Sequence, residues 1–474
     1  MKKNDLNFNS DKPQSDIRNT IRVSIHEGIF AQMHNTISAP GSVFITKFAV
    51  ILGATPLQFG ILAAMGQLSQ VFQPLGVTIT RKRTSRKKPV VNMVVLFRLL
   101  PLLYGFLPFL FPAHQAIWAF LLLFMLSTSL HATCYNMWIA WLSDMIPLRI
   151  RGRFFSRRNQ WTMVSGLATG YILGAIIDLF DAEPGLMTNT VKSFIGDIAV
   201  LAPENLTYSF AIVFIFSTIM GLIGAKILNK QPEHPKPIEQ DKFRNIAFDT
   251  LKDKNFRRLL FYGFWWMLAI GIGAPFWQPF MIKKLHMSIV GIQIYGTIST
   301  AFAFLALRPW GQIIDRFGNR TAMRFAILLG GLNPMIWLFA SASNYWIVYI
   351  EAATSGIMWS GAQIVATNFV LSIAPDKKRQ IYSGIFGAFS GVAMMLTMFF
   401  SGALMPQALN IIGFHLEPEQ VLFAITGLTR WSAEIPLTWV QESRAKPMSA
   451  AIYYLGQIAK VRIARLAWWR NKKK

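Results

Sequence analysis

The chain has 474 residues, of which 53% are hydrophobic and only 15% are charged. That balance excludes an ordinary soluble enzyme of this length and indicates a protein that is surrounded by a lipid bilayer. The net charge of +25 would suggest a nucleic-acid partner in a soluble protein, but the basic residues stand in short stretches between apolar runs, so we expect no nucleic-acid binding.

Long runs without Asp, Glu, Lys or Arg recur along the chain. A helix needs roughly 20 apolar residues to cross a bilayer, whereas a barrel strand is about half as long and alternates in polarity. The predicted fold class is therefore all-α, a polytopic membrane protein with about twelve transmembrane helices. In chain order the expected helices are 21–52, 57–80, 89–111, 113–143, 159–179, 205–228, 259–282, 289–314, 320–342, 344–374, 380–405 and 420–440.

The helices divide into two sets of six, separated by a polar linker. The predicted organisation is an N-terminal arm (1–20), a first six-helix bundle (21–229), a linker (230–258), a second six-helix bundle (259–440) and a basic amphipathic tail (441–474). Within the first predicted helix, Pro40 and Gly41 predict a kink.

Basic clusters occupy every second connection between the predicted helices. This positive-inside pattern places both termini in the cytoplasm, and we expect a multi-pass protein of the cytoplasmic (inner) membrane that is a monomer. The tail mixes basic with apolar and aromatic residues, which predicts contact with anionic lipids of the inner leaflet. A loosely ordered basic tail is the alternative interpretation of the same residues.

Short motifs of the first half recur in the second half, in the same order and at nearly constant offsets. The recurrences are Ala39-Pro40 with Ala274-Pro275, Gly60-Ile61 with Gly291-Ile292, Gly76 and Arg81 with Gly311 and Arg316, and Pro147 and Arg151 with Pro375 and Arg379. They indicate a duplicated six-helix unit, which is an architecture of carriers that bind their substrate between two halves.

One of these repeats carries a family resemblance. The segment Gly311-Gln-Ile-Ile-Asp315-Arg316-Phe-Gly318-Asn-Arg320 resembles the loop signature of the major facilitator superfamily, of the bacterial permease type. The resemblance implies that these residues latch the cytoplasmic side, with the Asp315 carboxylate accepting hydrogen bonds from an opposing helix N-terminus. Thr80 replaces the aspartate in the first-half copy, so the latch should rest on the second half.

Two further turns look like other cytoplasmic turns of that family. The first comprises Asp144 and the segment around Arg151, and the second comprises Pro375 and Arg379. Asp144 is a candidate partner for a loop arginine, or else it only marks an interface between helices.

In this family helices one, four, seven and ten line the substrate cavity, so the resemblance singles out polar and aromatic residues on those helices. An unpaired polar group that faces lipid costs several kcal/mol, hence these side chains should point inward. Hydrogen bonds between helices are the alternative role, and the pair formed by His131 and Tyr135 is slightly favoured as a substrate contact. The candidates are His34, Asn35, His131, Tyr135, Asn136, Trp265, Trp266, Gln278, Trp359 and Gln363.

Five of the ionisable residues within the predicted helices are candidates for a role inside the membrane. Arg98 has no acid in its own span, so its partner must be another helix, a carbonyl or an anionic ligand. Arg430 and Glu434 are four residues apart and can pair locally. Glu27 stands near the inner end of its helix, where water can hydrate it, and Glu351 is the carboxylate best placed to bind or release a proton.

The predicted function is secondary transport of a small organic solute by alternating access, driven by a proton or Na⁺ gradient. The aromatic content permits sugar-like substrates and apolar or cationic drugs alike. Because no cage of acidic residues is predicted at the midplane, a sugar-like or weakly anionic substrate is preferred, with proton-driven drug efflux as the alternative. A receptor or scaffold with a transporter fold is a further alternative, and channel features are missing. One cysteine and seven scattered histidines offer no catalytic or metal-binding set, so we expect no enzyme activity, cofactor or metal.

Overall fold

The computed structural model describes residues 14–81, 84–181, 202–233, 250–375, 379–411, 414–442 and 445–454, which group into two compact units. The first unit takes the described residues up to 233 together with 274–294 and 395–405, and the second takes 250–273, 295–394 and 406–454. Much of the predicted arm, linker and tail (1–13, 234–249 and 455–474) lies outside the described residues.

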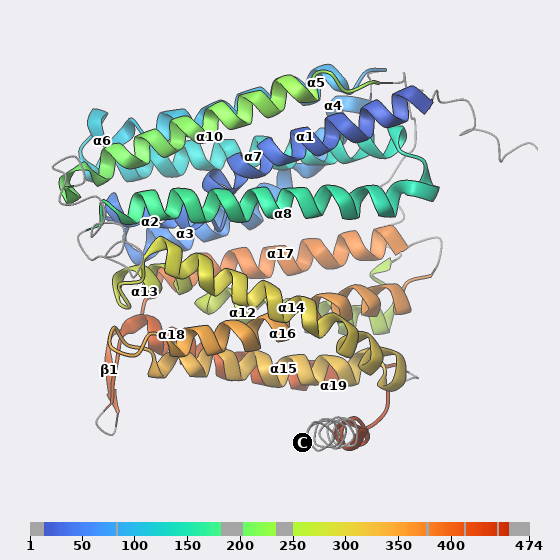
Figure 1. Cartoon of the computed structure of the whole chain (residues 1–474). Coiled ribbons are helices and arrows are strands. Elements are labelled where there is room, and N and C mark those ends of the chain that lie inside the picture. Colours follow the sequence, from blue (N-terminus) through green and yellow to red (C-terminus); the bar gives the residue numbers. More distant parts are fainter. Residues whose placement is uncertain are drawn as a thin grey trace, which may run out of the picture. The chain divides into compact units, whose positions relative to one another are not determined.

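The first unit is built from helices that run side by side along most of their length (Figure 1). Its helices are α1 (Gln14–Ser38), α2 (Val43–Ile51), α3 (Pro56–Leu68), the short η1 (Ser69–Phe72), α4 (Gln73–Arg81), α5 (Lys87–Tyr104), α6 (Leu107–Leu110), α7 (Ala113–Met145), α8 (Leu148–Asp178), η3 (Pro203–Asn205), α10 (Leu206–Leu228) and α13 (Trp277–Lys283).

The second unit is also helical, with one small hairpin. It holds α12 (Lys254–Gly273), most of α14 (Ile289–Phe317), α15 (Asn319–Ile336), η4 (Trp337–Phe339), α16 (Ile347–Ile373), most of α17 (Arg379–Ala403), β1 (Leu409–Ile411), β2 (Phe414–Leu416), α18 (Pro418–Ser432) and α19 (Glu434–Thr438). The two strands pair antiparallel, with Leu409 opposite Leu416. No strand was predicted from the sequence.

Eight helices of the described chain are long and apolar enough to cross a membrane. The other four predicted spans are helical as well, but each departs from an uninterrupted apolar helix. The first carries several charges, the second contains η1, the third is the short helix α5 with Lys87, Lys88 and Arg98, and the last is divided into α18 and α19. The all-α, polytopic prediction is confirmed.

The kink predicted in the first helix is a complete break. Helix α1 ends at Ser38, and α2 begins at Val43 after a turn in which Gly41 has a φ of 82°, a conformation that glycine adopts without strain. The Ser42 hydroxyl accepts a hydrogen bond from the amide of Phe44 and caps α2.

Helix α8 begins at Leu148, well before the predicted start at residue 159, so the basic cluster 149–158 is helical instead of a loop. Pro147 stands directly before its first turn, where the missing amide hydrogen costs nothing. The Arg151 guanidinium donates to the carbonyls of Ser143 and Ile146 at the end of α7, at 2.7 and 3.2 Å. These bonds satisfy carbonyls that the helix end leaves unpaired.

In each unit, a glutamate that follows one helix caps the N-terminus of another. Glu233, past the end of α10, accepts hydrogen bonds from the amides of Arg86 and Lys87 at the start of α5. Glu442, past the end of α19, accepts from the amides of Asn319 and Arg320 at the start of α15, at 2.9 and 2.7 Å. Each carboxylate also lies where the helix dipole favours negative charge.

The segments of the second half that belong to the first unit are held by polar contacts. Gln278 of α13 accepts from the Thr46 hydroxyl at 2.6 Å and donates to the Gly41 carbonyl at 2.9 Å. Asp178, the last residue of α8, accepts from the amides of Ile289 and Val290 at the start of α14, at 2.7 and 2.9 Å. In the predicted orientation, Thr46, Gln278 and Asp178 all lie in the outer halves of their predicted helices.

Candidate functional site

A cavity of about 260 Å³ lies inside the first unit, between α1, α5, α7 and α8. Its walls combine charged, amide, hydroxyl and aromatic groups. The lining residues are Glu27, Gly28, Ala31, Gln32, Asn35, Val94, Phe97, Arg98, His131, Cys134, Tyr135, Trp138, Arg158, Asn159, Thr162 and Leu228.

The centre of the cavity wall is a carboxylate between two guanidinium groups. Glu27 of α1 accepts from Arg98 of α5 at 2.8 Å through one oxygen and from Arg158 of α8 at 3.3 Å through the other. Glu27 and Arg98 are only 3% and 4% exposed. The prediction that Glu27 is merely hydrated is therefore wrong, because its helix face points toward two arginines and away from solvent.

Both arginines have further partners that fix their position. Arg98 donates to the Gly221 carbonyl of α10 at 3.0 Å, so its predicted need for a partner outside its own helix is confirmed. Arg158 donates to the Ser24 carbonyl at 3.2 Å, and its guanidinium lies over the Trp138 ring at 4.8 Å. The three helices that carry the ion pairs are thus joined through this one cluster.

Glycines leave the space that the arginines occupy. A β-carbon on Gly224 of α10 would stand 2.7 Å from Nη1 of Arg98, and one on Gly28 of α1 would stand 3.0 Å from the Arg158 guanidinium. Any larger residue at Gly224 would displace Arg98.

The candidates on α1 and α7 have separate positions. Asn35, His131 and Tyr135 line the cavity. His34 is buried instead between α1 and α10, where its ring nitrogen lies 3.1 Å from the Ser217 carbonyl. Asn136 points to the other side of α7 and donates to Gln73 at 3.2 Å.

The remaining candidates do not line this cavity. Gln278 bonds to α2 and to the turn before it, as described above. Trp265 donates to the Ser432 hydroxyl at 3.0 Å, and Trp266 is buried in the core of the second unit against Gly330. Trp359 lies beside Arg430, with 5.9 Å between the guanidinium and the ring centre, and Gln363 is exposed.

The second unit has its own buried arginine. Arg430 of α18 donates to the Gly330 carbonyl of α15 at 3.0 Å, whereas Glu434 pairs with Arg324. The predicted local pair of Arg430 with Glu434 is therefore wrong, because α18 ends at Ser432 and the two residues no longer share one helix face. Glu351 is buried and accepts from the Tyr295 hydroxyl at 2.8 Å.

The bonds of Arg98 and Arg430 join corresponding pairs of helices, but the arginine is on the opposite helix of the pair in each unit. Arg98 and Gly330 stand at the same position counted from the starts of α5 and α15, and Gly221 and Arg430 stand at the same distance before the capping residues Glu233 and Glu442. In the first unit the arginine of α5 reaches a glycine carbonyl of α10. In the second, the arginine of α18 reaches a glycine carbonyl of α15.

The loop residues of the family signature occupy the start of α15 and the end of α14. Gly318 has a φ of 85° directly before α15, and Arg316 lies 4.4 Å from the centre of the Tyr454 ring. The amide of Arg320 donates to Glu442. Asp315 is exposed and has no hydrogen bond or ion pair to a residue of the described part, so its latch role stays a prediction, and Gly311 has open space around it.

The residues of the other turns are also placed. Asp144 accepts from Arg86, an arginine of the loop before α5, at 2.5 Å, which is the kind of partner predicted for it. Pro375 follows α16, and Arg379 is the exposed first residue of α17. Roles of these residues in gating stay predictions.

Sequence reasoning missed several residues of the cavity, above all Arg158. The sequence contains the helical spacing of Arg158, Asn159 and Thr162 on one face of α8, but the density of basic residues in 149–158 favours a loop there. Glu27 is the only acid among the lining residues and Arg98 and Arg158 are the basic ones, so the lining carries a net positive charge with both arginines ionised. Such a site can hold an anion.

Comparisons with known proteins agree with this architecture. The family model described as Major Facilitator Superfamily matches residues 29–396. A search of curated proteins found no match.

Several solved structures share the fold. A mutant of the nucleoside transporter NupG is similar with a TM-score of 0.64 and 13% identity, over 89% of this chain and 100% of that one. The xylose transporter XylE from E. coli, in an inward open conformation, has a TM-score of 0.62 and 14% identity, over 91% and 98%. A bacterial homologue of the iron transporter ferroportin has a TM-score of 0.58 and 11% identity, over 91% and 100%. Since the family model covers most of the sequence, the chain belongs to the major facilitator superfamily.

Proposed function

We propose that this transporter is a secondary active carrier of a small organic anion, and that the cavity of the first unit holds the anionic group. One observation carries the proposal: Glu27 stands between the buried Arg98 and the half-buried Arg158, so two cations share one carboxylate. A guanidinium group binds a substrate carboxylate through two parallel hydrogen bonds, and a partly desolvated cavity strengthens that attraction. Inner-membrane location and cytoplasmic termini are part of the proposal.

We also propose Glu27 as the residue that couples transport to protons. When Glu27 is ionised, it occupies one guanidinium edge of both arginines, and when it is protonated, those edges are available to the substrate. A proton and a monovalent anion would then travel together without net charge. Glu351, bonded to Tyr295, is the second carboxylate that could take part.

Uptake into proteoliposomes tests the anion specificity. Purified protein would be presented with labelled pools of organic acids, neutral sugars and cationic drugs. We expect saturable uptake of an organic acid that Arg98→Gln reduces by at least about tenfold in kcat/KM, the scale of one lost charge-assisted hydrogen bond. The variant Arg98→Lys, which keeps the positive charge, serves as a check that loss of uptake is not loss of fold.

The other outcomes have distinct meanings. Uptake of sugars alone would favour the aromatic wall formed by Phe97, Tyr135 and Trp138 as the recognition element, and would reject the anion proposal. Export of cationic drugs would point to efflux. No transport in any pool, with substrate binding retained, would indicate a receptor or scaffold.

Proton coupling is tested separately with Glu27→Gln. We expect the variant to exchange labelled for unlabelled substrate across the membrane but to lose accumulation driven by a pH gradient, because an amide cannot carry a proton. Glu204→Gln, at an exposed position, is the matched control. Accumulation at the wild-type level in Glu27→Gln would reject Glu27 as the coupling residue while leaving the anion proposal intact.

A further inference from the structure

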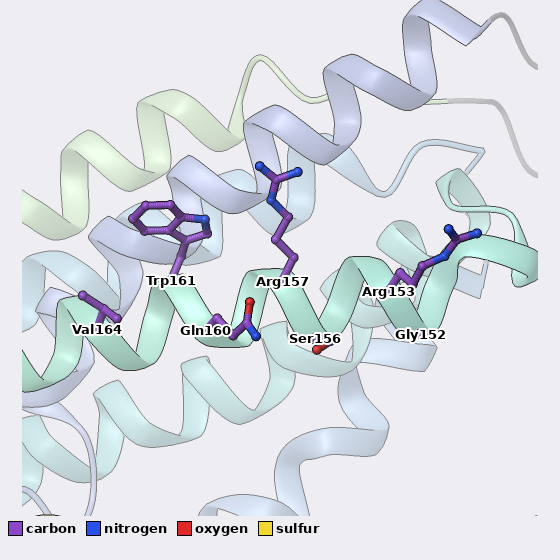
Figure 2. A pocket seen from close by; sticks show the side chains of 7 residues that line it. All are labelled: Gly152, Arg153, Ser156, Arg157, Gln160, Trp161 and Val164. Carbon is purple, nitrogen blue, oxygen red and sulfur yellow. The ribbon is translucent and has the colours of Figure 1, made fainter.

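A second, open pocket of about 620 Å³ lies along one helix, α8. Figure 2 shows its lining side chains, all from this helix, with Arg157 and Trp161 projecting from the same side. They are Gly152, Arg153, Ser156, Arg157, Gln160, Trp161 and Val164. The pocket does not share a residue with the cavity proposed to hold substrate, which takes Arg158, Asn159 and Thr162 from the next face of α8.

The two arginines of this pocket differ from other arginines of α8. Arg151 and Arg158 both have partners, as described above, whereas Arg153 and Arg157 form no hydrogen bond or ion pair with any residue that the structure describes. They are four residues apart, so their charges lie one above the other on the helix, which is unfavourable unless an anion is near. The only acid of α8, Asp178, is at its opposite end.

Above the arginines, the same exposed stripe becomes apolar. Trp161, Val164 and Ile172 are 49%, 59% and 60% exposed, and they follow Arg157 at the spacing of one helix face. From Arg157 to Ile172 the helix rises about 22 Å, at 1.5 Å a residue. The order is therefore two cations, an indole, and then aliphatic side chains, which is the order of headgroup, interface and acyl chain in one leaflet.

We propose that this pocket binds an anionic phospholipid of the inner leaflet. The phosphate lies between Arg153 and Arg157, with Ser156 and Gln160 as further donors, and an acyl chain runs over Trp161 and Val164. Charge complementarity selects the lipid over a zwitterionic one, and the exposed apolar stripe distinguishes a lipid from a free phosphate. The basic start of α8 is the cytoplasmic end in the orientation proposed above.

Native mass spectrometry of the full-length protein tests this site. The protein would be titrated with dioleoylphosphatidylglycerol and with dioleoylphosphatidylcholine. We expect the wild type to prefer the anionic lipid, and the variant Arg153→Gln/Arg157→Gln to bind it about 25-fold more weakly, since each basic residue near a lipid surface contributes on the order of a fivefold change. Arg153→Lys/Arg157→Lys should keep most of the preference.

The matched control removes the same charge elsewhere. Arg22 and Arg257 are exposed on α1 and α12, and Arg22→Gln/Arg257→Gln should bind the anionic lipid as the wild type does. If both double variants lost the same affinity for the anionic lipid, the effect would come from net charge alone, and the proposed site would be overturned. Unchanged binding in Arg153→Gln/Arg157→Gln would overturn it as well.

A second measurement distinguishes a lipid from a small anion. Trp161→Ala removes the indole but no charge, and it should weaken the binding of dioleoylphosphatidylglycerol. Glycerol phosphate should bind equally weakly to the wild type and to this variant. If glycerol phosphate displaced the lipid at similar concentrations, the pocket would be a site for free phosphate compounds and the lipid proposal would be rejected. Because these side chains are exposed, we expect the variants to fold like the wild type, and thermal denaturation tests this expectation.

Discussion

At the scale of single residues, the cavity depends on how a large cation is accommodated between helices. Arg98 is buried and makes two bonds, yet its Nε atom has no partner in the described structure. A buried guanidinium that lost its remaining partners would be strongly destabilising. The buried position of Arg98 therefore depends on the small residues next to it, such as Gly224, as much as on Glu27.

Gly224→Ala tests this dependence. The added methyl group would stand 2.7 Å from the Arg98 guanidinium, and we expect a loss of about 1 to 3 kcal/mol in the free energy of unfolding together with weaker substrate binding. Gly296→Ala, in α14, adds the same methyl group where no atom lies within 4 Å and should cause no loss. Thermal denaturation in detergent measures both variants, and equal stability of the two would contradict the packing argument.

The sequence predicts that a buried charged residue needs a partner better than it predicts which partner the residue has. A charge such as Arg98 in a membrane helix needs a partner, and that requirement follows from solvation alone. Which partner it takes depends on the rotation of each helix about its axis, which a single sequence does not fix. For the same reason, three of the ten predicted cavity residues, Asn35, His131 and Tyr135, line the cavity while His34 and Asn136 bond between helices.

At the scale of helices, the two capping glutamates tie the end of one helix to the start of another. Glu442 meets two amides and the side chain of Asn319, and so holds the start of α15 next to the chain that leaves α19. Four amides at a helix start lack partners within the helix, which makes this bond more than a surface contact.

Glu442→Ala should free the first turn of α15. We expect stability to fall by about 1 to 2 kcal/mol, the value of a lost N-terminal cap with its dipole contribution. Hydrogen–deuterium exchange of the amides of Asn319 and Arg320 should accelerate, while α5, capped by Glu233, keeps its exchange rate. Glu204→Ala, an exposed glutamate of η3, is the control, and unchanged exchange in α15 would exclude the capping role.

Helix positions were predictable because apolar length is set by the bilayer, but helix ends were not. The sequence predicts the start of α8 too late because a run of arginines favours a cytoplasmic loop, although Pro147 marks a helix start equally well. The β1–β2 hairpin was missed because strands of three residues carry too little periodicity to detect.

At the scale of the whole molecule, the repeat in the sequence corresponds to repeated interactions. The motifs that recur in the two halves predicted a duplicated unit, and the capped starts of α5 and α15 are one structural expression of it. The sequence did not predict that 274–294 and 395–405 of the second half pack with the first unit. Such packing depends on contacts between segments far apart in the chain, which a single sequence does not fix.

A cross-link between Thr46 and Gln278 tests whether these contacts open during transport. Their side chains meet at 2.6 Å, and Cys134, the sole native cysteine, is buried, so a double cysteine variant would give a clean reaction. We expect a short cross-linker that attaches to the cysteines through disulfide bonds to abolish transport, and a reducing agent to restore it. The control pair is Phe109 with Tyr208, both in the first half, whose rings are 4.8 Å apart. Transport that persists through the first cross-link would show that α2 and α13 do not separate.

The reciprocal bonds of Arg98 and Arg430 bear on how the two halves diverged. After a gene duplication, each copy can mutate as long as its helices stay joined, and here an arginine on either helix of the pair meets a glycine carbonyl on the other. An alignment of the halves scores Arg98 against Gly330 and Gly221 against Arg430 as mismatches, although the arginine–carbonyl bond between the two helices is the same in both halves. Ancestry in such a protein is therefore better traced by comparing which helices are bonded than by comparing which residues are shared.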